Sequence, residues 1–211
     1  MKTSLRIFAA AIGVLTAVSV TAAELTFTAL LDGKPIGEHR FRVTGAPDQR
    51  EVLSEARFDV KWLGVTLYRY RHQATERWRG DCLASLVATT DDDGKESQVR
   101  AETVGDSLLV ASGSDTTPAS RLPGCVVSFA YWNPAIQTQS RLLNAQSGKL
   151  ETVRVSRAGS GSVEVRGRPV AATRWRIEGP PEPIDVWYSA QGWVGLDSAI
   201  GGGRTLSYRL K

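Results

Sequence analysis

Two titratable side chains, His72 and Glu76, lie four residues apart in a stretch that alternates between aromatic and charged residues. In an extended strand this spacing puts both on the same face, about 13 Å apart along the chain. They are too far apart to hydrogen-bond to each other, but both can point into one shared cavity. Tyr68 and Tyr70 lie on the same face, so the pattern indicates a polar patch inside an aromatic pocket, which is typical of a small-ligand site.

The opposite face of this stretch carries Arg69, Arg71 and Arg77, and we expect it to be solvated. The aromatic face is then the inner one, and it includes His72 and Glu76. The structural alternative is that both side chains pair with neighbouring Arg or Tyr residues at the rim of the fold and bind nothing.

A second aromatic concentration, Phe129 to Pro134, adds Trp132 to the candidate ligand-binding residues. It lies where an apolar stretch, Cys125 to Tyr131, meets the start of a predicted helix. Trp132 would then form a wall or the mouth of the cavity. The alternative is an aromatic plug that closes one end of the core, which is the commoner role of such residues.

The sequence offers little for catalysis, so an enzyme is less expected than a binding protein. His39 and His72 are the only histidines, and no G-x-S-x-G elbow accompanies them. They lie on separate predicted strands and make a poor ligand set, so we expect no metal and no cofactor. The acidic run at Asp91 to Gly94 lacks the spacing of a calcium-binding loop, and we interpret it as a charged turn between two strands. No pair of carboxylates is singled out for glycoside hydrolysis.

The N-terminus has the pattern of an export signal. Lys2 and Arg6 precede an apolar run from Ile7 to Val20, and small residues follow. We predict a signal peptide at residues 1–23, although an uncleaved anchor is the alternative. The run is short for a membrane span, which takes about 20 residues.

The remaining residues, 24–211, are expected to form a single domain of ordinary size. The prediction is a periplasmic or secreted protein with no membrane span after cleavage. The chain has 26 Lys and Arg against 22 Asp and Glu, and its net charge of +4 falls to +2 without Lys2 and Arg6. Its basic residues are spread along the predicted strands, so nucleic acid is not an expected partner.

The two cysteines, Cys82 and Cys125, both lie in the predicted mature chain. An exported chain meets oxidising conditions, so we expect one disulfide between them. Two free thiols are the alternative. A metal site is not favoured, because neither cysteine has a second ligand at the usual spacing.

Period-2 alternation punctuated by Gly, Pro and Asp turns predicts an almost entirely β protein. The predicted strands are Glu24 to Leu31, Ile36 to Val43, Arg50 to Trp62, Val65 to Trp78, Cys82 to Thr90, Lys95 to Thr103, Leu108 to Ala111, Cys125 to Tyr131, Leu150 to Arg157, Ser162 to Arg166, Val170 to Ile177, Ile184 to Ser189, Trp193 to Leu196 and Leu206 to Leu210. Asn133 followed by Pro134 predicts one short helix, from Ala135 to about Leu143.

Strands joined by tight turns pair antiparallel, and this many strands would leave exposed edges unless the sheet curls. We therefore predict an all-β fold in which an antiparallel meander curls into a closed or nearly closed barrel. A two-sheet β-sandwich is the alternative.

Five motifs, spread over nearly the whole predicted mature chain, carry a resemblance to a known group. They are LDGKPIGEHRF (Leu31 to Phe41), ERWRGDCL (Glu76 to Leu83), SFAYWNP (Ser128 to Pro134), LLNAQSG (Leu142 to Gly148) and IDVWYSAQGWVGL (Ile184 to Leu196). The chain resembles a family of exported bacterial proteins classed as a domain of unknown function. The resemblance implies an exported, mostly antiparallel β domain and favours the Cys82–Cys125 disulfide. It assigns no catalytic residue.

Three functions remain open at this point. The leading hypothesis is the binding of a small or amphiphilic, lipid-like ligand inside the barrel, lined by Tyr68, Tyr70, His72, Glu76 and Trp132. The second is an envelope enzyme that acts on glycan or lipid. The third is a structural or accessory envelope protein with a filled core.

Overall fold

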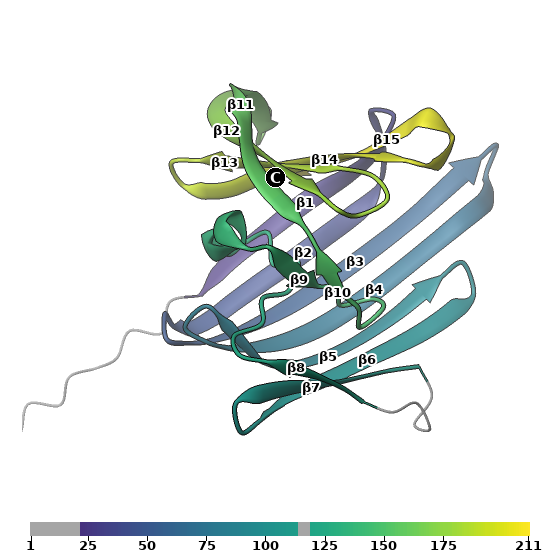
Figure 1. The fold of residues 1–211 in the computed structure, drawn as a ribbon. Helices are drawn as coiled ribbons and strands as arrows, with labels where there is room; N and C mark the ends of the chain where they lie inside the picture. The colour runs from purple at the N-terminus through teal and green to yellow at the C-terminus, as the bar shows by residue number, and fades with distance from the viewer. Residues whose placement is uncertain (1–21, 114–118) are drawn as a thin grey trace, which may run out of the picture.

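The computed structural model describes residues 22–113 and 119–211, and these form an almost wholly antiparallel β structure (Figure 1). The predicted signal peptide lies almost entirely outside the described residues. The strands are β1 (Ala23–Leu31), β2 (Lys34–Ala46), β3 (Gln49–Trp62), β4 (Val65–Arg79), β5 (Cys82–Asp92), β6 (Lys95–Val104), β7 (Ser107–Ser112), β8 (Ser120–Pro123), β9 (Arg141–Leu143), β10 (Leu150–Thr152), β11 (Arg154–Val165), β12 (Arg168–Glu178), β13 (Ile184–Ser189), β14 (Gly192–Ile200) and β15 (Arg204–Leu210).

One 13-stranded sheet contains all of these strands except β9 and β10, which pair with each other. Its order is β11-β12-β13-β14-β15-β1-β2-β3-β4-β5-β6-β7-β8. Strands β1 to β8 form one meander and β11 to β15 form another. The last strand, β15, pairs antiparallel with the first, β1, and so joins the two meanders into one sheet.

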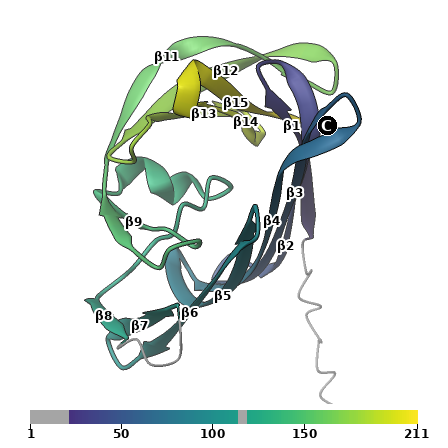
Figure 2. The same ribbon diagram turned by 90° about the vertical axis from the view of Figure 1, so that its right-hand side faces the viewer.

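The sheet curls strongly without closing. Figure 2 shows β11 to β15 arching over β5 to β8, with β1 to β4 joining the two halves. Within the described residues, the edge strands β8 and β11 are not paired with each other. The all-β, curled antiparallel prediction is confirmed, and of the predicted closed or nearly closed barrel the closed form is wrong. The two facing halves give the fold some of the two-layer character of the alternative sandwich.

A segment that we call the crossing segment, residues 124–153, runs between the two open edges and fills much of the concave side. Its buried apolar residues are Val126, Val127, Ala130, Ile136, Leu142, Leu143 and Val153. The predicted Cys82–Cys125 disulfide is present and ties the start of this segment to β5. Next to it, the backbone N–H of Leu83 donates to the carbonyl of Val126 at 2.8 Å.

Two local predictions fail in the crossing segment. The apolar run Cys125 to Tyr131 is largely buried, but it forms only an isolated bridge at Ser128. An apolar run predicts burial more surely than it predicts a strand. The helix begins as predicted at Asn133, whose side chain accepts from the N–H of Ala135, yet it is a 3-10 helix, η1 (Pro134–Thr138). The chain then pairs β9 with β10 instead of continuing the helix.

A third difference lies near the open edge. The predicted strand Leu150 to Arg157 is divided between β10 and β11, and β11 continues through the predicted glycine break. The β11–β12 register shifts between Arg157 and Gly159, so the glycine run makes an irregularity within a strand and does not end it.

Candidate functional site

A cavity of about 250 Å³ lies between the concave face of the sheet and the crossing segment. Strands β2, β3 and β4 form one wall, β13 to β15 form the facing wall, and residues from 128 to 146 form the third side. Its lining residues are His39, Phe41, Val52, Ser54, Tyr70, His72, Ala74, Glu76, Ser128, Phe129, Ala130, Tyr131, Trp132, Asn144, Ala145, Gln146, Ile184, Leu196, Ser198, Ile200, Leu206 and Tyr208. The lining is mainly apolar and aromatic, with a few polar side chains among them.

Tyr70 and Tyr208 line the cavity, and both rings pack against Phe58, which does not line it. The rings of Phe58 and Tyr70 stack with centroids 5.3 Å apart, and Tyr208 lies 6.0 Å from Phe58. Period-2 geometry places Tyr70, His72, Ala74 and Glu76 on the inner face of β4. Burial raises the pKa of Tyr70 and of Tyr208 well above the usual value, so both phenols remain protonated and can donate hydrogen bonds at neutral pH.

The inner end of the cavity holds a buried carboxyl group, Glu76. The indole N–H of Trp78 donates to its Oε2 at 3.0 Å, and the hydroxyl of Ser128 donates to its Oε1 at 2.7 Å. Burial raises the pKa of Glu76, whereas the hydrogen bonds from Ser128 and Trp78 act in the opposite direction. Since Ser128 belongs to the crossing segment, this pair also holds that segment against β4.

A second polar group is centred on His39. Its Nε2 lies 2.8 Å from Ser54 Oγ, and its Nδ1 lies 3.4 Å from the hydroxyl of Tyr208. The three residues come from β2, β3 and β15. Burial lowers the pKa of His39 to about 3, and the nearby His72 adds to this effect, so the ring is neutral at physiological pH. A neutral imidazole offers one donor and one acceptor to its surroundings.

His72 forms the third polar group. Its Nδ1 lies 2.8 Å from Thr90 Oγ1 on the neighbouring strand β5. Burial lowers the pKa of His72 to about 4, so this ring is also neutral near pH 7. The cavity therefore offers hydrogen-bonding groups without a net positive charge.

Four of the five predicted ligand-binding residues, Tyr70, His72, Glu76 and Trp132, line the cavity. Tyr68 does not line it. Tyr68 lies beyond the last β4–β5 pair, and its hydroxyl donates to Asp92 Oδ1 at 2.6 Å. His72 and Glu76 are paired with Thr90, Trp78 and Ser128, and not with the Arg or Tyr partners of the structural alternative.

Trp132 links the cavity to the packed core behind it. Its ring packs edge-on against Trp78 with centroids 5.3 Å apart, and the guanidinium of Arg50 lies 5.0 Å from its ring centroid. One face of the indole therefore belongs to the core and another part belongs to the cavity wall. The wall and plug interpretations of Trp132 both describe part of its position.

Sequence reasoning missed His39, Ser54, Ser128 and Tyr208 as lining residues. The alternation within β2 does put His39 on the same strand face as Phe41. The alternation within β15 puts Tyr208 on the same strand face as Leu206. That signal places each residue inside the sheet. It does not show that β2 and β15 lie near each other.

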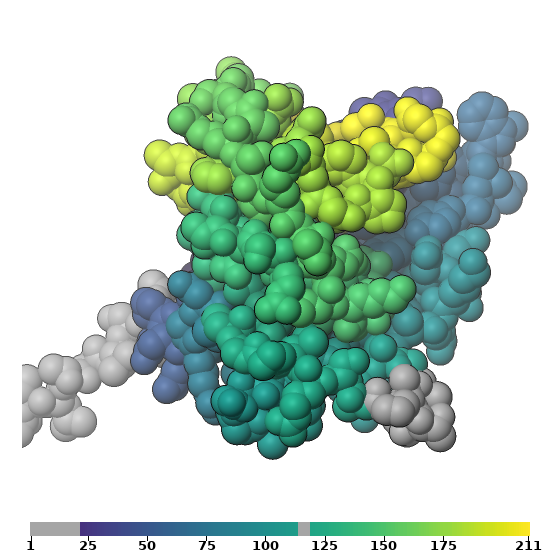
Figure 3. Space-filling model, in the orientation of Figure 1, coloured from purple at the N-terminus to yellow at the C-terminus, as the bar shows by residue number. Residues whose placement is uncertain are grey.

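The cavity opens on the side formed by the β14–β15 hairpin and residues 144–146. Gln146 is exposed there, and Ser198, Ile200 and Leu206 are partly exposed, whereas Glu76 is buried at the other end. Figure 3 shows the blue strands recessed behind the yellow-green C-terminal strands and the green crossing segment. The more exposed side of the cavity therefore lies beside the β14–β15 hairpin.

In the described ranges, no three His, Cys, Asp or Glu side chains are grouped in a way that could hold a metal ion. Among the same residues, no helix is long and apolar enough to cross a membrane.

Residues 27–211 match a family described as a domain of unknown function, DUF6134. The chain belongs to this family. The match spans both meanders and the crossing segment of the DUF6134 fold, and therefore every residue of the cavity. No curated protein matches the chain.

The DUF6134 chain is also similar in structure to a beta-barrel-like protein of domain of unknown function DUF1849 from Brucella abortus. The TM-score is 0.63 at 13% sequence identity, and the match covers 92% of this chain and 98% of that chain. At this identity the likeness shows a shared fold and carries no function across.

Proposed function

We propose that this DUF6134 protein binds a compact, mostly apolar ligand with an uncharged polar end, inside the cavity of the curled sheet. The observation that carries the proposal is the cavity itself, with aromatic walls and three separate polar pairs. A cavity of about 250 Å³ exceeds the roughly 150 Å³ that accommodates benzene, and it lies just below the usual range for ligand sites. The ligand is accordingly small, or is the end of a longer molecule.

The chemistry of the walls favours an uncharged polar end. His39 and His72 are neutral near pH 7 because burial lowers the pKa of each. Ser54 beside His39 supplies a hydroxyl group to the wall, whereas Thr90, which does not line the cavity, holds the ring of His72. Trp78 and Ser128 each donate a hydrogen bond to Glu76, one to each oxygen of the carboxyl group. A hydroxyl or carbonyl group in the ligand would match these partners.

We place this function in the periplasm or outside the cell. The Cys82–Cys125 disulfide supports this location, because disulfides persist in oxidising compartments. The predicted signal peptide at residues 1–23 supports it independently.

The experiment fills the cavity by substitution and measures whether the protein loses a compound that co-purifies with it. Ala74 is buried and lines the cavity, so Ala74→Leu adds volume where the ligand would lie. Val87→Leu, on the exposed face of the neighbouring strand β5, is the matched control. Mature protein purified from its own host is extracted with solvent, and the extract is examined by mass spectrometry. We expect a compound from the wild type and from Val87→Leu, and none from Ala74→Leu.

A defined probe makes the test decisive. 2-Naphthol is a compact aromatic molecule with one hydroxyl, and its fluorescence reports binding. We expect saturable binding to the wild type, at least ten-fold weaker binding to Ala74→Leu, and weaker binding to Ser54→Ala. If the extracts are empty and both proteins take up the probe equally or not at all, the proposal is refuted.

The His39–Ser54 pair supports a second candidate, an envelope hydrolase, because a serine within 2.8 Å of an imidazole resembles a nucleophile with its base. Two features disfavour it. The lowered pKa of His39, about 3, makes the imidazole a weak base. Strand β3 is paired on both sides, so its backbone N–H groups lie in the sheet and cannot form an oxyanion hole facing the cavity. Covalent labelling of Ser54 by a fluorophosphonate would favour the hydrolase.

A further inference from the structure

The tip of the β3–β4 hairpin is the most exposed apolar feature among the described residues. Trp62 is 64% exposed and Leu63 is 89% exposed, and Val65 and Leu67 are also largely in solvent. Four large apolar side chains within six residues are unusual on the surface of a monomeric soluble protein. We call this feature, residues 61–67, the hairpin tip.

The hairpin tip projects beyond both neighbouring strands. The last β2–β3 pair is Gly37 with Phe58, and the last β4–β5 pair is Tyr70 with Asp92. Val65 is five residues beyond Tyr70, which at about 3.3 Å per residue places the turn on the order of 15 Å further out. Figure 1 shows this hairpin as the long blue projection at the right. The tip can therefore contact another surface without any movement of the rest of the sheet.

The turn at the tip uses a residue that the local geometry disfavours. Three two-residue turns at this end of the sheet have positive φ at both positions: Asp32-Gly33, Leu63-Gly64 and Asp93-Gly94. Asp and Asn tolerate this left-handed conformation, whereas other residues with a Cβ incur about 1 kcal/mol or more. Leu63, at φ 47°, therefore has both an unfavourable backbone conformation and an exposed apolar side chain. Neither feature helps the isolated chain to fold.

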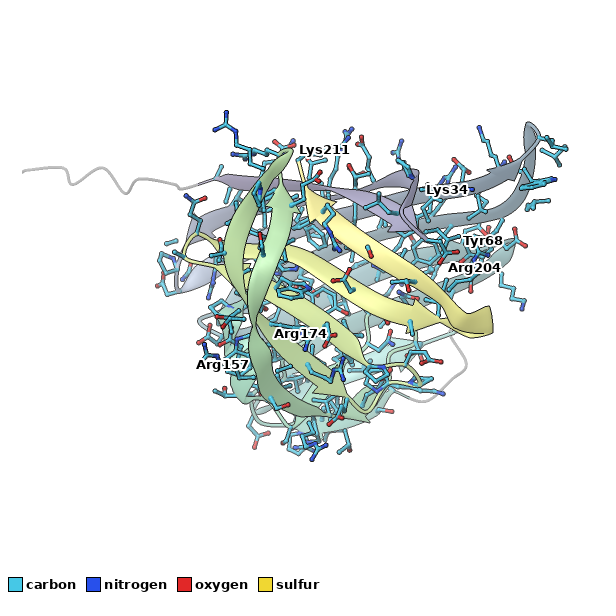
Figure 4. All side chains as sticks on the ribbon, turned by 90° about the horizontal axis from the view of Figure 1, so that it is seen from above. Lys34, Tyr68, Arg157, Arg174, Arg204 and Lys211 are labelled. Carbon is cyan, nitrogen blue, oxygen red and sulfur yellow. A yellow bond between two sulfur atoms is a disulfide. The ribbon has the colours of Figure 1, made fainter. Side chains whose placement is uncertain are left out.

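The charges around the tip complement an anionic lipid surface. Lys61 is the only charged residue between Val60 and Tyr68, and it forms no ion pair within the described part of the chain. Trp and Tyr prefer the level of the lipid headgroups, and Leu and Val prefer the acyl region below. Figure 4 shows Tyr68 with Lys34 and Arg204 at the same end of the molecule, where Arg204 pairs with Asp32 at 3.3 Å.

The acidic residues nearby stand further back than the tip. In the β5–β6 turn, Asp91 accepts from the N–H of Gly94, Asp92 accepts from the hydroxyl of Tyr68, and Asp93 accepts from the N–H of Arg69. Asp59, at the base of the tip, pairs with Arg71 at 2.8 Å. These carboxylates lie behind the projecting part of the hairpin.

We infer that the hairpin tip docks the protein on a membrane surface that contains anionic lipid. The β14–β15 hairpin beside the cavity mouth lies at the same end of the sheet, as Figures 1 and 4 both show. Docking would therefore bring the mouth close to the lipid headgroups. The inference concerns an interaction surface that is separate from the cavity lining, and it does not require that the cavity hold a ligand.

The test is flotation of the mature protein, residues 24–211, with vesicles of phosphatidylcholine and phosphatidylglycerol in a 7:3 ratio. We expect the wild type to float with the vesicles, less so at high salt and less so without phosphatidylglycerol. Leu63→Asn should lower the partition coefficient at least ten-fold and Lys61→Gln should lower it less. Val87→Thr removes apolar surface from an exposed residue on β5, 54% exposed, and should float like the wild type.

The Leu63→Asn variant also distinguishes weaker membrane binding from a loss of folded protein. Asn suits the left-handed turn position, so this variant should be at least as stable as the wild type in urea while it binds vesicles less. Ala74→Leu, which fills the cavity, should float normally and so separates docking from ligand binding. Equal flotation of wild type and Leu63→Asn would overturn the inference, as would no flotation of the wild type. A dimer that Leu63→Asn dissociates, without vesicle binding, would assign the tip to a second copy of the chain and overturn it too.

Discussion

Acid should destabilise this protein through His72, and a single substitution isolates the effect. His72 is neutral in the fold, and burial lowers its pKa from the ordinary 6.5 to about 4. In the unfolded chain the ring becomes protonated as the pH falls below about 6.5, so the unfolded state binds more protons than the folded state between the two values. The contribution of His72 to stability is therefore fully present above pH 6.5 and is lost as the pH falls towards 4.

The size of this effect follows from the two pKa values. Each pH unit between them corresponds to about 1.4 kcal/mol. Between pH 7 and pH 4.5 the wild type should lose about 2.5 kcal/mol of unfolding free energy through His72 alone. His72→Gln keeps a polar group beside Thr90 and removes the titration. The gap in unfolding free energy between wild type and variant should therefore change by about 2.5 kcal/mol over this range.

Two other cavity groups, His39 and Glu76, also have pKa values shifted by burial. The lowered pKa of His39 adds a slope of the same sign, whereas the raised pKa of Glu76 opposes it, since a buried neutral carboxyl favours the folded state at lower pH. Both groups are present in wild type and variant alike, so the comparison removes their contributions except for the part of the His39 shift that His72 itself causes.

Urea unfolding at pH 7.0, 5.5 and 4.5 measures the difference in unfolding free energy between wild type and His72→Gln. The comparison holds when the unfolding free energy of both proteins has the same slope against urea concentration. Gln73→His is the control, because it adds a histidine on the exposed face of the same strand and should add no comparable slope. Parallel loss of stability in wild type and His72→Gln would show that the ring of His72 is accessible to protons in the fold.

Three further changes test the framework around the cavity. Removal of the disulfide in Cys82→Ala/Cys125→Ala, which opens a loop of sequence separation 43, should lower the unfolding free energy in urea by about 4 kcal/mol. Ser128→Ala removes the 2.7 Å donor to Glu76 and should cost about 1–3 kcal/mol in urea at pH 7. Gly37→Ala would place a Cβ 1.9 Å from a carbonyl oxygen of the neighbouring strand, so it should cost about 4 kcal/mol or more and lower the yield of folded protein.

Each of these changes has an outcome that contradicts its reasoning. A disulfide-free protein as stable as the wild type would mean that the unfolded chain gains little freedom. A Ser128→Ala variant as stable as the wild type would mean that the hydroxyl of Ser128 adds nothing to the attachment of the crossing segment to Glu76. Gly201→Ala is the control for Gly37→Ala, because a Cβ at Gly201 meets no atom within 4 Å, and similar behaviour of the two variants would refute the steric argument.

The local alternation of β4 was sufficient to predict which side chains face inward. Side chains alternate strictly in a strand, so the solvated arginines identify the outer face and assign Tyr70, His72 and Glu76 to the inner one. The same rule failed for Tyr68 because it says nothing about where a neighbouring strand ends. Strand β5 stops at Asp92, and Tyr68 lies beyond that point.

The facing wall could not be predicted from local patterns. His39 and Tyr208 lie 169 positions apart in the sequence, and they meet because β15 pairs with β1. Nothing in the alternation of either strand specifies that pairing. The polar groups of the cavity were accordingly half predicted: those on β4 were identified, and those on β2, β3 and β15 were not.

The open sheet and the cavity have a common cause in the crossing segment. A closed barrel would need β8 and β11 to pair, but residues 124–153 pass between these edges and fill the interior with irregular backbone. Space remains between this segment and the sheet beside Ser128 and Ala130.

The position of this segment is fixed at few points in the sheet. The disulfide and the Leu83–Val126 hydrogen bond hold its start, and the hydroxyl of Tyr188 donates to the carbonyl of Tyr131 at 2.7 Å further along. Reduction of the disulfide should therefore act on the cavity as well as on stability. We expect the reduced protein to bind the 2-naphthol probe less tightly than the oxidised protein under conditions where both are folded. Equal affinity would show that the bonds made by Ser128 and Tyr131 position the segment without the disulfide.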